Sequence, residues 1–409
     1  MADSSASPSV KQTLQGYHQL VSADLDRTVR FWLDHSVDDQ CGGFFSCLEA
    51  DGTVYDCTKY SWPMCRQVWM LARLYQEVDR FHQPHVLEAA SKGGEFILQH
   101  VQEASSCRCY LSLTREGRPL KLQRTIFSEA FFVMAVSELY RVTRHARYKE
   151  RADATMAKII HWVRVDSTEL GFSVAPPTHV SSLSVPMILL MLIGQMETVE
   201  PARTAEFSAL GDWCVQQISR HVVDRGANRG GLAVMENVGQ DGGLLPGCSG
   251  RLMNPGHAIE AGWFLLERAA KTDSESLAAL ALDIVSSSFR RGWDSRHGGL
   301  LSFIDLEDRP PTQLEWDMKM WWPHNEAMIA FLMAYKHTKD DGYLDKFGQV
   351  LDYSVKHFVD PEHGEWFGYL SREGVVKINA KGGQWKGFFH VPRALMMCEA
   401  MLQELLQTC

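Results

Sequence analysis

Apolar residues recur along most of the chain at the spacing of an α-helix, in segments separated by short stretches that contain glycine. The segments RQVWMLARLYQEV, from Arg66, and VLEAASKGGEFILQHV, from Val86, place apolar side chains at positions i, i+3, i+4 and i+7. Some segments are apolar on nearly every side, including VPMILLMLIG from Val185 and EAMIAFLMAY from Glu326. Such helices are expected to be buried all round. The pattern therefore predicts helices in pairs, one inner and one outer.

The stretches between the helical segments have the alternating, glycine-rich pattern of short β-hairpins. Six copies occur, about 60 to 68 residues apart, and they contain Gly43, Tyr110, Gly171, Gly231, Gly299 and Trp366. An Asp-x-x-x-Gly motif starts at Asp39, Asp294 and Asp360. This repetition indicates one structural unit used six times.

Six repeats with two helices each predict an all-α fold, a closed (α/α)6 barrel of twelve helices with short β-hairpins between the helix pairs. Because no Gly/Ser-rich or Pro-rich linker interrupts the pattern, residues 1–409 are predicted to form a single domain, with residues 1–9 disordered. An open helical solenoid is the alternative. It is less favoured because its end repeats should carry polar caps.

Composition and net charge limit the classes of partner that the chain is expected to bind. The net charge of −9 and the absence of clustered Lys and Arg argue against a nucleic-acid or anionic-membrane surface. The N-terminus MADSSASPSV lacks the pattern of a signal peptide, and no stretch is apolar for long enough to span a membrane, so a cytoplasmic protein is expected. Ten cysteines without CxxC spacing favour reduced thiols over a disulfide framework.

The first turns of the inner helices hold most of the candidate chemistry. If these helices all begin at one end of the barrel, their first turns line a common cavity, the usual form of an active site. The titratable candidates there are Arg66, Glu129, His257, Glu260, His324, Glu326, His390 and Arg393. The pairs His257/Glu260 and His390/Arg393 have i, i+3 spacing and share a face. His324 and Glu326 are two residues apart, so we expect that one of them points away or that the helix starts between them.

A histidine at a helix N-terminus is held neutral by the helix dipole and can act as a base. His257 and His390 occupy equivalent positions in the fourth and sixth inner helices, where they would face each other across the cavity. Trp322 and Trp385 could provide flat platforms for a sugar ring. The chain has no HExxH spacing, so no metal site is predicted. It also has no GxxxxGK[ST] phosphate loop, which argues against nucleotide hydrolysis by that motif.

Several long motifs resemble the N-acylglucosamine 2-epimerase family. They include KYSWPMCRQVWM, QRTIFSEAFF, NPGHAIEAGWFLL, PTQLEWDMKMWWPHNEAMIAFLM and KGFFHVPRAL, and the resemblance runs from about residue 10 to the C-terminus. It implies an isomerase of amino-sugar and sialic acid metabolism that interconverts N-acetyl-D-glucosamine and N-acetyl-D-mannosamine. It also implies a homodimer that binds renin and is stimulated by ATP or a related nucleotide without consuming it, so no cofactor is required.

Within this family pattern, Arg66, His257 and His390 match catalytic positions, with Glu260 and His324 in the surrounding pocket. The chemistry suits them: inverting C2 requires ring opening, removal of a proton, and return of a proton to the opposite face. We expect His257 and His390 to exchange protons with C2, Arg66 to stabilise the enolate oxygen, and Glu260 to orient His257. Glu129, Glu326, Trp322, Trp385 and Arg393 are predicted to bind substrate.

Other functions remain open at this point. A related sugar isomerase or disaccharide 2-epimerase could use the same scaffold. An inverting glycoside hydrolase would need two carboxyl groups on either side of the scissile bond, which Glu129 and Glu326 could supply, but it would leave the histidines without a role. The third alternative is a non-catalytic partner of renin.

Overall fold

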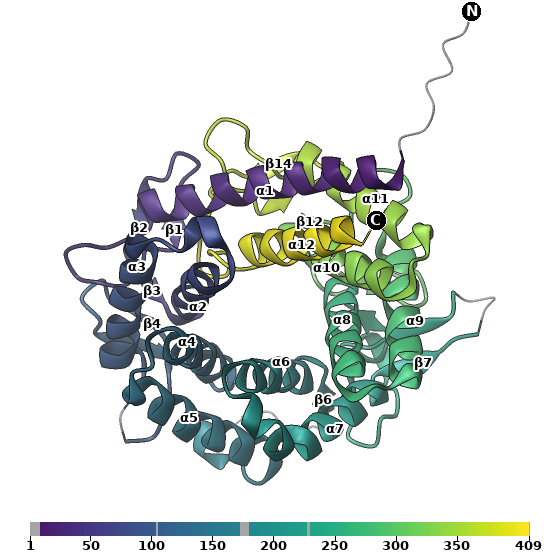
Figure 1. Ribbon diagram of the computed structural model, residues 1–409. Coiled ribbons are helices and arrows are strands. Elements are labelled where there is room, and N and C mark those ends of the chain that lie inside the picture. Colours follow the sequence, from purple (N-terminus) through teal and green to yellow (C-terminus); the bar gives the residue numbers. More distant parts are fainter. Residues whose placement is uncertain (1–8, 104, 172–179, 227–229, 409) are drawn as a thin grey trace, which may run out of the picture.

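Twelve α-helices form two concentric rings in the part of the chain that the computed structural model describes, residues 9–103, 105–171, 180–226 and 230–408 (Figure 1). The inner ring consists of α2 (Ser61–Glu77), α4 (Phe127–Thr143), α6 (Ser184–Val199), α8 (Pro255–Thr272), α10 (Trp321–Thr338) and α12 (His390–Gln407). The outer ring consists of α1 (Val10–His35), α3 (Pro84–Phe96), α5 (Ala146–Arg164), α7 (Thr204–Arg220), α9 (Glu275–Gly292) and α11 (Asp341–His357). Short 3₁₀ or π segments span Asp79–Phe81, Ile97–Val101, Thr168–Leu170, Pro201–Arg203 and Gly247–Gly250.

The inner ring is closed. Each inner helix contacts the next one, and α12 contacts both α10 and α2. The predicted (α/α)6 barrel is therefore confirmed, and the open solenoid is wrong. The residues expected to be disordered, 1–9, lie outside the described part of the chain except for Ser9, which caps α1 by accepting a hydrogen bond from the backbone of Gln12.

The extent of side-chain burial differs between the inner and the outer helices. In the inner helix α10 the buried residues run through every turn, from Trp321 to Tyr335, whereas the outer helix α11 buries mainly one face, including Leu344, Phe347 and Leu351. The all-round apolar segments of the sequence thus form the inner ring, as predicted. None of the helices in the described ranges is both long and apolar enough to cross a membrane.

The pairing of the β-strands agrees only in part with the predicted pattern of six local hairpins. Local hairpins join β1 (Cys47–Leu48) to β2 (Val54–Asp56), β4 (Tyr110–Leu113) to β5 (Pro119–Leu122), β7 (Val222–Asp224) to β8 (Leu232–Val234), and β13 (Tyr369–Leu370) to β14 (Val376–Ile378). The copy at Gly299 instead sends β11 (Ile304–Asp305) to pair with β10 (Leu252–Met253). The copy at Gly171 falls mostly on residues 172–179, outside the described chain.

Four strands hold the start of an inner helix against a distant hairpin strand. The strands β3 (Lys59–Tyr60) and β12 (Lys319–Met320) pair with β4 and β13, while β6 (Val180–Ser182) pairs with β9 (Asn237–Gly239) and β10 with β11. Each of the first-named strands lies directly before its inner helix, or within two residues of it. These pairings fix the mouth of the barrel at which the inner helices begin.

Buried ion pairs reinforce two of these junctions and the segment before α12. Lys59 and Lys319, on the strands before α2 and α10, pair with Asp38 and Asp294 at 3.0 Å, and Lys381 pairs with Asp360 at 2.8 Å. The motif in the first repeat therefore starts at Asp38 rather than at Asp39, whose side chain is 80% exposed. The turn glycines are required there because Gly42 and Gly298 have φ values of 78° and 73°.

Candidate active site

A cavity of about 370 Å³ opens where the inner helices begin. All six inner helices contribute to its wall, which is lined by Trp62, Arg66, Phe127, Phe131, Ser184, Met187, Ile188, Met191, Glu236, His257, Glu260, Phe264, Trp321, Trp322, Trp385, Phe389 and His390. Its size suits a small ligand such as one sugar ring. Of the ten predicted site residues, the cavity brings together Arg66, His257, Glu260, Trp322, Trp385 and His390.

His257 is placed by the start of α8. Asn254 caps this helix through a hydrogen bond from the backbone N–H of His257 to its side-chain oxygen, at 3.1 Å, and Pro255 occupies the first helical position. The imidazole Nδ1 lies 3.0 Å from both carboxylate oxygens of Glu236. Burial opposes the charged imidazole, but the carboxylate of Glu236, helped by Glu260, outweighs it and raises the pKa of His257 to about 9. At neutral pH this histidine is a proton donor, so the expectation of a neutral imidazole is wrong for His257 because the nearby carboxylates outweigh the helix dipole.

His390 is the first residue of α12 and has the opposite charge state. Its Nδ1 donates to Oε1 of Glu326 at 2.7 Å. Burial, followed by the positive charges of Arg393 and Arg66, holds the pKa of His390 well below its usual range. The imidazole is therefore neutral, with Nδ1 protonated and Nε2 unprotonated. One cavity thus holds an acidic and a basic histidine.

Arg66 has donors available for a ligand. Its guanidinium lies over the rings of Phe131 and Phe389, with its carbon 3.9 and 4.8 Å from the ring centroids. Its Nε has no hydrogen-bond partner, and no described residue forms an ion pair with it. Burial and Arg393 lower its pKa, but the group stays protonated at neutral pH. An unpaired buried cation suits an oxygen on which negative charge develops.

Arg393 and Glu326 do not line the cavity, but they form hydrogen bonds with residues that do. The guanidinium of Arg393 donates to Glu260 at 3.3 Å and also to Glu326. The ligand atoms of Glu260, Glu326 and His390 lie within 4.8 Å of one another, an arrangement that could hold a metal ion. Here Arg393 already supplies the positive charge between the two carboxylates. Burial and the neighbouring Glu326 raise the pKa of Glu260, so this residue can exchange a proton.

Two tryptophans line the cavity as expected. The ring of Trp322 lies between the two histidines, 5.0 Å from His257 and 5.9 Å from His390 by ring centroids. Trp385 is 45% exposed and packs edge-on against Trp62 at 5.1 Å. Both are placed to contact a bound ring, one deep in the site and the other at its mouth.

Two predicted site residues lie elsewhere. Glu129 is fully buried and accepts hydrogen bonds from Arg108 and from the backbone of Cys109, both at 2.9 Å. His324 is fully buried too, where Nδ1 donates to the carbonyl of Met320 and Nε2 accepts from the backbone of Leu300. Burial lowers the pKa of His324 to about 3. Neither lines the cavity, because Oε1 of Glu129 is bonded to Arg108 and Cys109 and both ring nitrogens of His324 are bonded to backbone groups.

The sequence analysis missed the partner of His257. The orienting role was predicted for Glu260, but Glu236 makes the hydrogen bonds to Nδ1. Glu236 lies between β8 and β9, not on an inner helix, so helical spacing could not find it. The only signal was an isolated carboxylate in the apolar hairpin segment GGLAVMENV. The position of Glu129 also removes one of the two carboxylates that a glycoside hydrolase would need.

Comparison with known proteins agrees with this geometry. Residues 43–394 match the family model of N-acylglucosamine 2-epimerase (GlcNAc 2-epimerase). The chain is 51% identical to N-acylglucosamine 2-epimerase of Bos taurus, over 97% of this chain and 93% of that protein, and 48% identical to that of Homo sapiens, over 97% and 92%. Cellobiose 2-epimerase from Spirochaeta thermophila has a similar fold, with a TM-score of 0.80 at 20% identity over 98% of this chain and 100% of that one. The chain therefore belongs to the N-acylglucosamine 2-epimerase family and is an isomerase of the carbohydrate-epimerase type.

Proposed function

We propose that the protein interconverts N-acetyl-D-glucosamine and N-acetyl-D-mannosamine by moving a proton at C2. One observation carries the proposal: two imidazoles of opposite charge state, each bonded to its own carboxylate, line one cavity together with an unpaired arginine. Inverting a carbon next to a carbonyl group needs a base on one face and an acid on the other. The bovine and human relatives carry the name of this activity.

The reaction begins with the open-chain aldehyde. Ring opening moves a proton from the C1 hydroxyl to the ring oxygen, and Glu260, whose pKa is raised by burial, is the candidate for that exchange. His324 lies outside the cavity and is not available for that exchange.

The epimerisation follows at C2. Nε2 of the neutral His390 takes the C2 proton, and the electrons of the C–H bond move to the carbonyl oxygen, where Arg66 stabilises the enolate. The protonated His257 then returns a proton to the opposite face. His390 ends protonated and His257 neutral, so the reverse reaction uses the same two groups in exchanged roles.

A substrate assay tests the proposal against its nearest alternatives. The protein is incubated with N-acetyl-D-mannosamine, D-mannose and cellobiose, and products are followed by ¹H NMR. We expect conversion of the first substrate only. Preferred conversion of mannose or cellobiose would identify a related isomerase or disaccharide 2-epimerase, and no conversion of any of them would contradict an enzyme of this type.

The family resemblance supports further proposals about assembly and regulation. We propose a cytoplasmic homodimer that is stimulated by ATP or a related nucleotide and that binds renin. Sedimentation analysis tests the dimer, and activity with a non-hydrolysable ATP analogue tests stimulation without consumption. Binding of purified renin tests the third proposal.

A further inference from the structure

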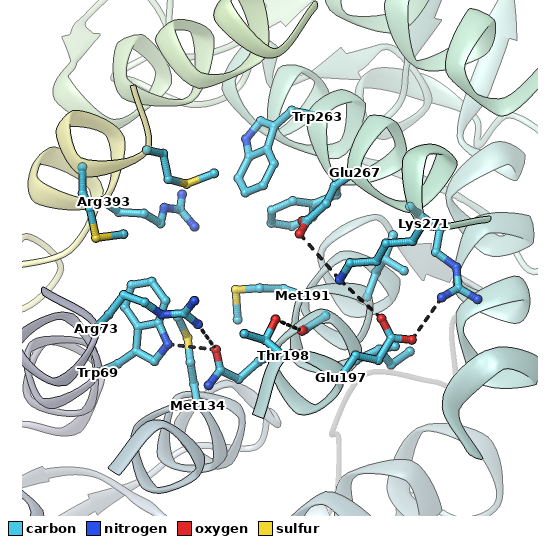
Figure 2. A pocket seen from close by; sticks show the side chains of 18 of the residues that line it. Trp69, Arg73, Met134, Met191, Glu197, Thr198, Trp263, Glu267, Lys271 and Arg393 are labelled. Carbon is cyan, nitrogen blue, oxygen red and sulfur yellow. Dashed lines mark hydrogen bonds and ion pairs between the residues drawn. The ribbon is translucent and has the colours of Figure 1, made fainter. Parts of the chain in front are cut away.

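A second hollow lies at the other end of the barrel axis. It has a volume of about 240 Å³ and is lined by the later turns of the inner helices (Figure 2). Met191 and Phe264 line both this hollow and the candidate active site. The two cavities therefore share part of their walls.

Two residues in the wall of the second hollow hold the carboxylate that binds His390. Trp263 and Arg393 both border the rear hollow, as Figure 2 shows. The indole Nε1 of Trp263 donates to Oε2 of Glu326 at 3.0 Å, and Arg393 donates to Oε1, the oxygen that also accepts from His390. Glu326 is fully buried and so depends on these protein donors alone.

The carboxylate that binds His257 has a different environment. In the described part of the chain, the only hydrogen bonds to the Glu236 carboxylate come from His257. Three side chains donate hydrogen bonds to the carboxylate of Glu326, whereas His257 is the one described side chain that donates to the carboxylate of Glu236. The two histidines are therefore supported unequally, although each is bonded to a glutamate.

We propose that Trp263 is a positioning residue, whose indole N–H anchors one oxygen of Glu326 so that the other oxygen holds His390 with Nε2 directed into the cavity. A carboxylate bound at one oxygen can rotate, whereas one bound at both oxygens is fixed in plane. The same bond draws charge away from the oxygen that faces His390. The assignment rests on the proposed roles of the histidines, but its test does not depend on which sugar is turned over.

Several other groups also act on His390 and stay unchanged in the test. They are Glu326 from α10, Arg393 from α12, Arg66 from α2, and Glu260 and His257 from α8. Removing the indole N–H changes none of these residues. A shift in the pH profile is then attributable to the lost bond.

Trp263→Phe tests the proposal, because it keeps a flat aromatic ring and removes the donor. We expect kcat to fall about tenfold with KM within about twofold, and the acidic limb of the pH profile to move upward, as Glu326 then acts more strongly on His390. The assay uses whichever of the three sugars the wild-type protein converts. Failure of the proposed function would appear in that wild-type reaction, before any variant is compared.

Trp69→Phe is the matched control. Trp69 lines the same hollow and also uses its indole Nε1 as a donor, at 3.0 Å, but its acceptor is Gln195 rather than Glu326. This variant loses the same kind of bond and should keep the wild-type kcat and pH profile. An equal loss of kcat in both variants would overturn the proposal.

A second variant separates positioning from packing. Trp263→His fills the space less well than Phe but keeps a ring N–H, so a positioning role predicts a higher kcat than in Trp263→Phe. A purely structural role predicts the reverse order, because Phe is the better filler. That reverse order, or a wild-type kcat and pH profile in Trp263→Phe, would show that Trp263 is only part of the wall.

Discussion

Both carboxylate oxygens of Glu236 lie 3.0 Å from Nδ1 of His257. This contact makes His257 an acid at neutral pH, since it raises the pKa of the imidazole to about 9 against the effect of burial. At His390 the corresponding glutamate is shared with Trp263 and Arg393, and the imidazole is neutral. The two histidines begin the reaction in different states because Glu236 outweighs burial at His257, whereas burial and the charges of Arg393 and Arg66 dominate at His390.

The pH dependence of kcat/KM should follow from this difference. Activity is expected to fall below the usual range of histidine, as His390 becomes protonated, and to fall again above about pH 9, as His257 loses its proton. Glu236→Gln removes the charge that raises the pKa of His257, so its basic limb should move to lower pH by about one unit or more. A basic limb that stays in place would show that another group controls it.

Arg66→Lys keeps the positive charge but loses the planar pair of donors. We expect kcat to fall by about 10² to 10³, the usual effect of losing one donor to a developing oxyanion, with a smaller change in KM. Steady-state kinetics with both epimers provide the measurement. Wild-type kcat in this variant would assign Arg66 a structural role only.

The variant His324→Ala tests whether His324 stabilises the core or contacts substrate. Because His324 binds the backbone of Leu300 and Met320 and lies outside the cavity, this variant should lose about 2 to 4 kcal/mol of stability while KM stays close to wild type. Chemical unfolding and kinetics at low temperature measure the two effects. A raised KM in a folded variant would place His324 in contact with substrate.

The buried pair of Lys319 and Asp294 should be costly to break. Asp294→Ala leaves the fully buried ammonium of Lys319 without its carboxylate, and a loss of about 3 to 5 kcal/mol is expected from chemical unfolding. Replacing both residues, with Asp294→Ala and Lys319→Met, should recover part of that loss because the buried ammonium is then absent and only the partly exposed Arg372 loses a partner. Equal stability of the single variant and the wild type would contradict a structural role for the pair.

The sequence predicts those parts of the site that local helical geometry controls. The Asn254–Pro255 start places His257 in the first turn of α8, and the two-residue separation of His324 and Glu326 correctly indicates that they diverge. The partner of His257 could not be predicted, because Glu236 reaches it from a hairpin 21 residues away along the chain. The position of Glu129 could not be predicted for a similar reason: Arg108, from a hairpin segment, binds it outside the cavity.

Isotope exchange at C2 tests the two-histidine account most directly. In D₂O the wild-type protein should place deuterium at C2 of the product from the first turnover with either epimer, as followed by ¹H NMR, because the returned proton comes from an imidazole that exchanges with solvent. His257→Asn and His390→Asn should both lose epimerisation, and each should exchange the C2 proton of the opposite epimer. If either variant epimerises at the wild-type rate, or if both exchange the same epimer equally well, one base and a rotating intermediate replace the two-histidine mechanism.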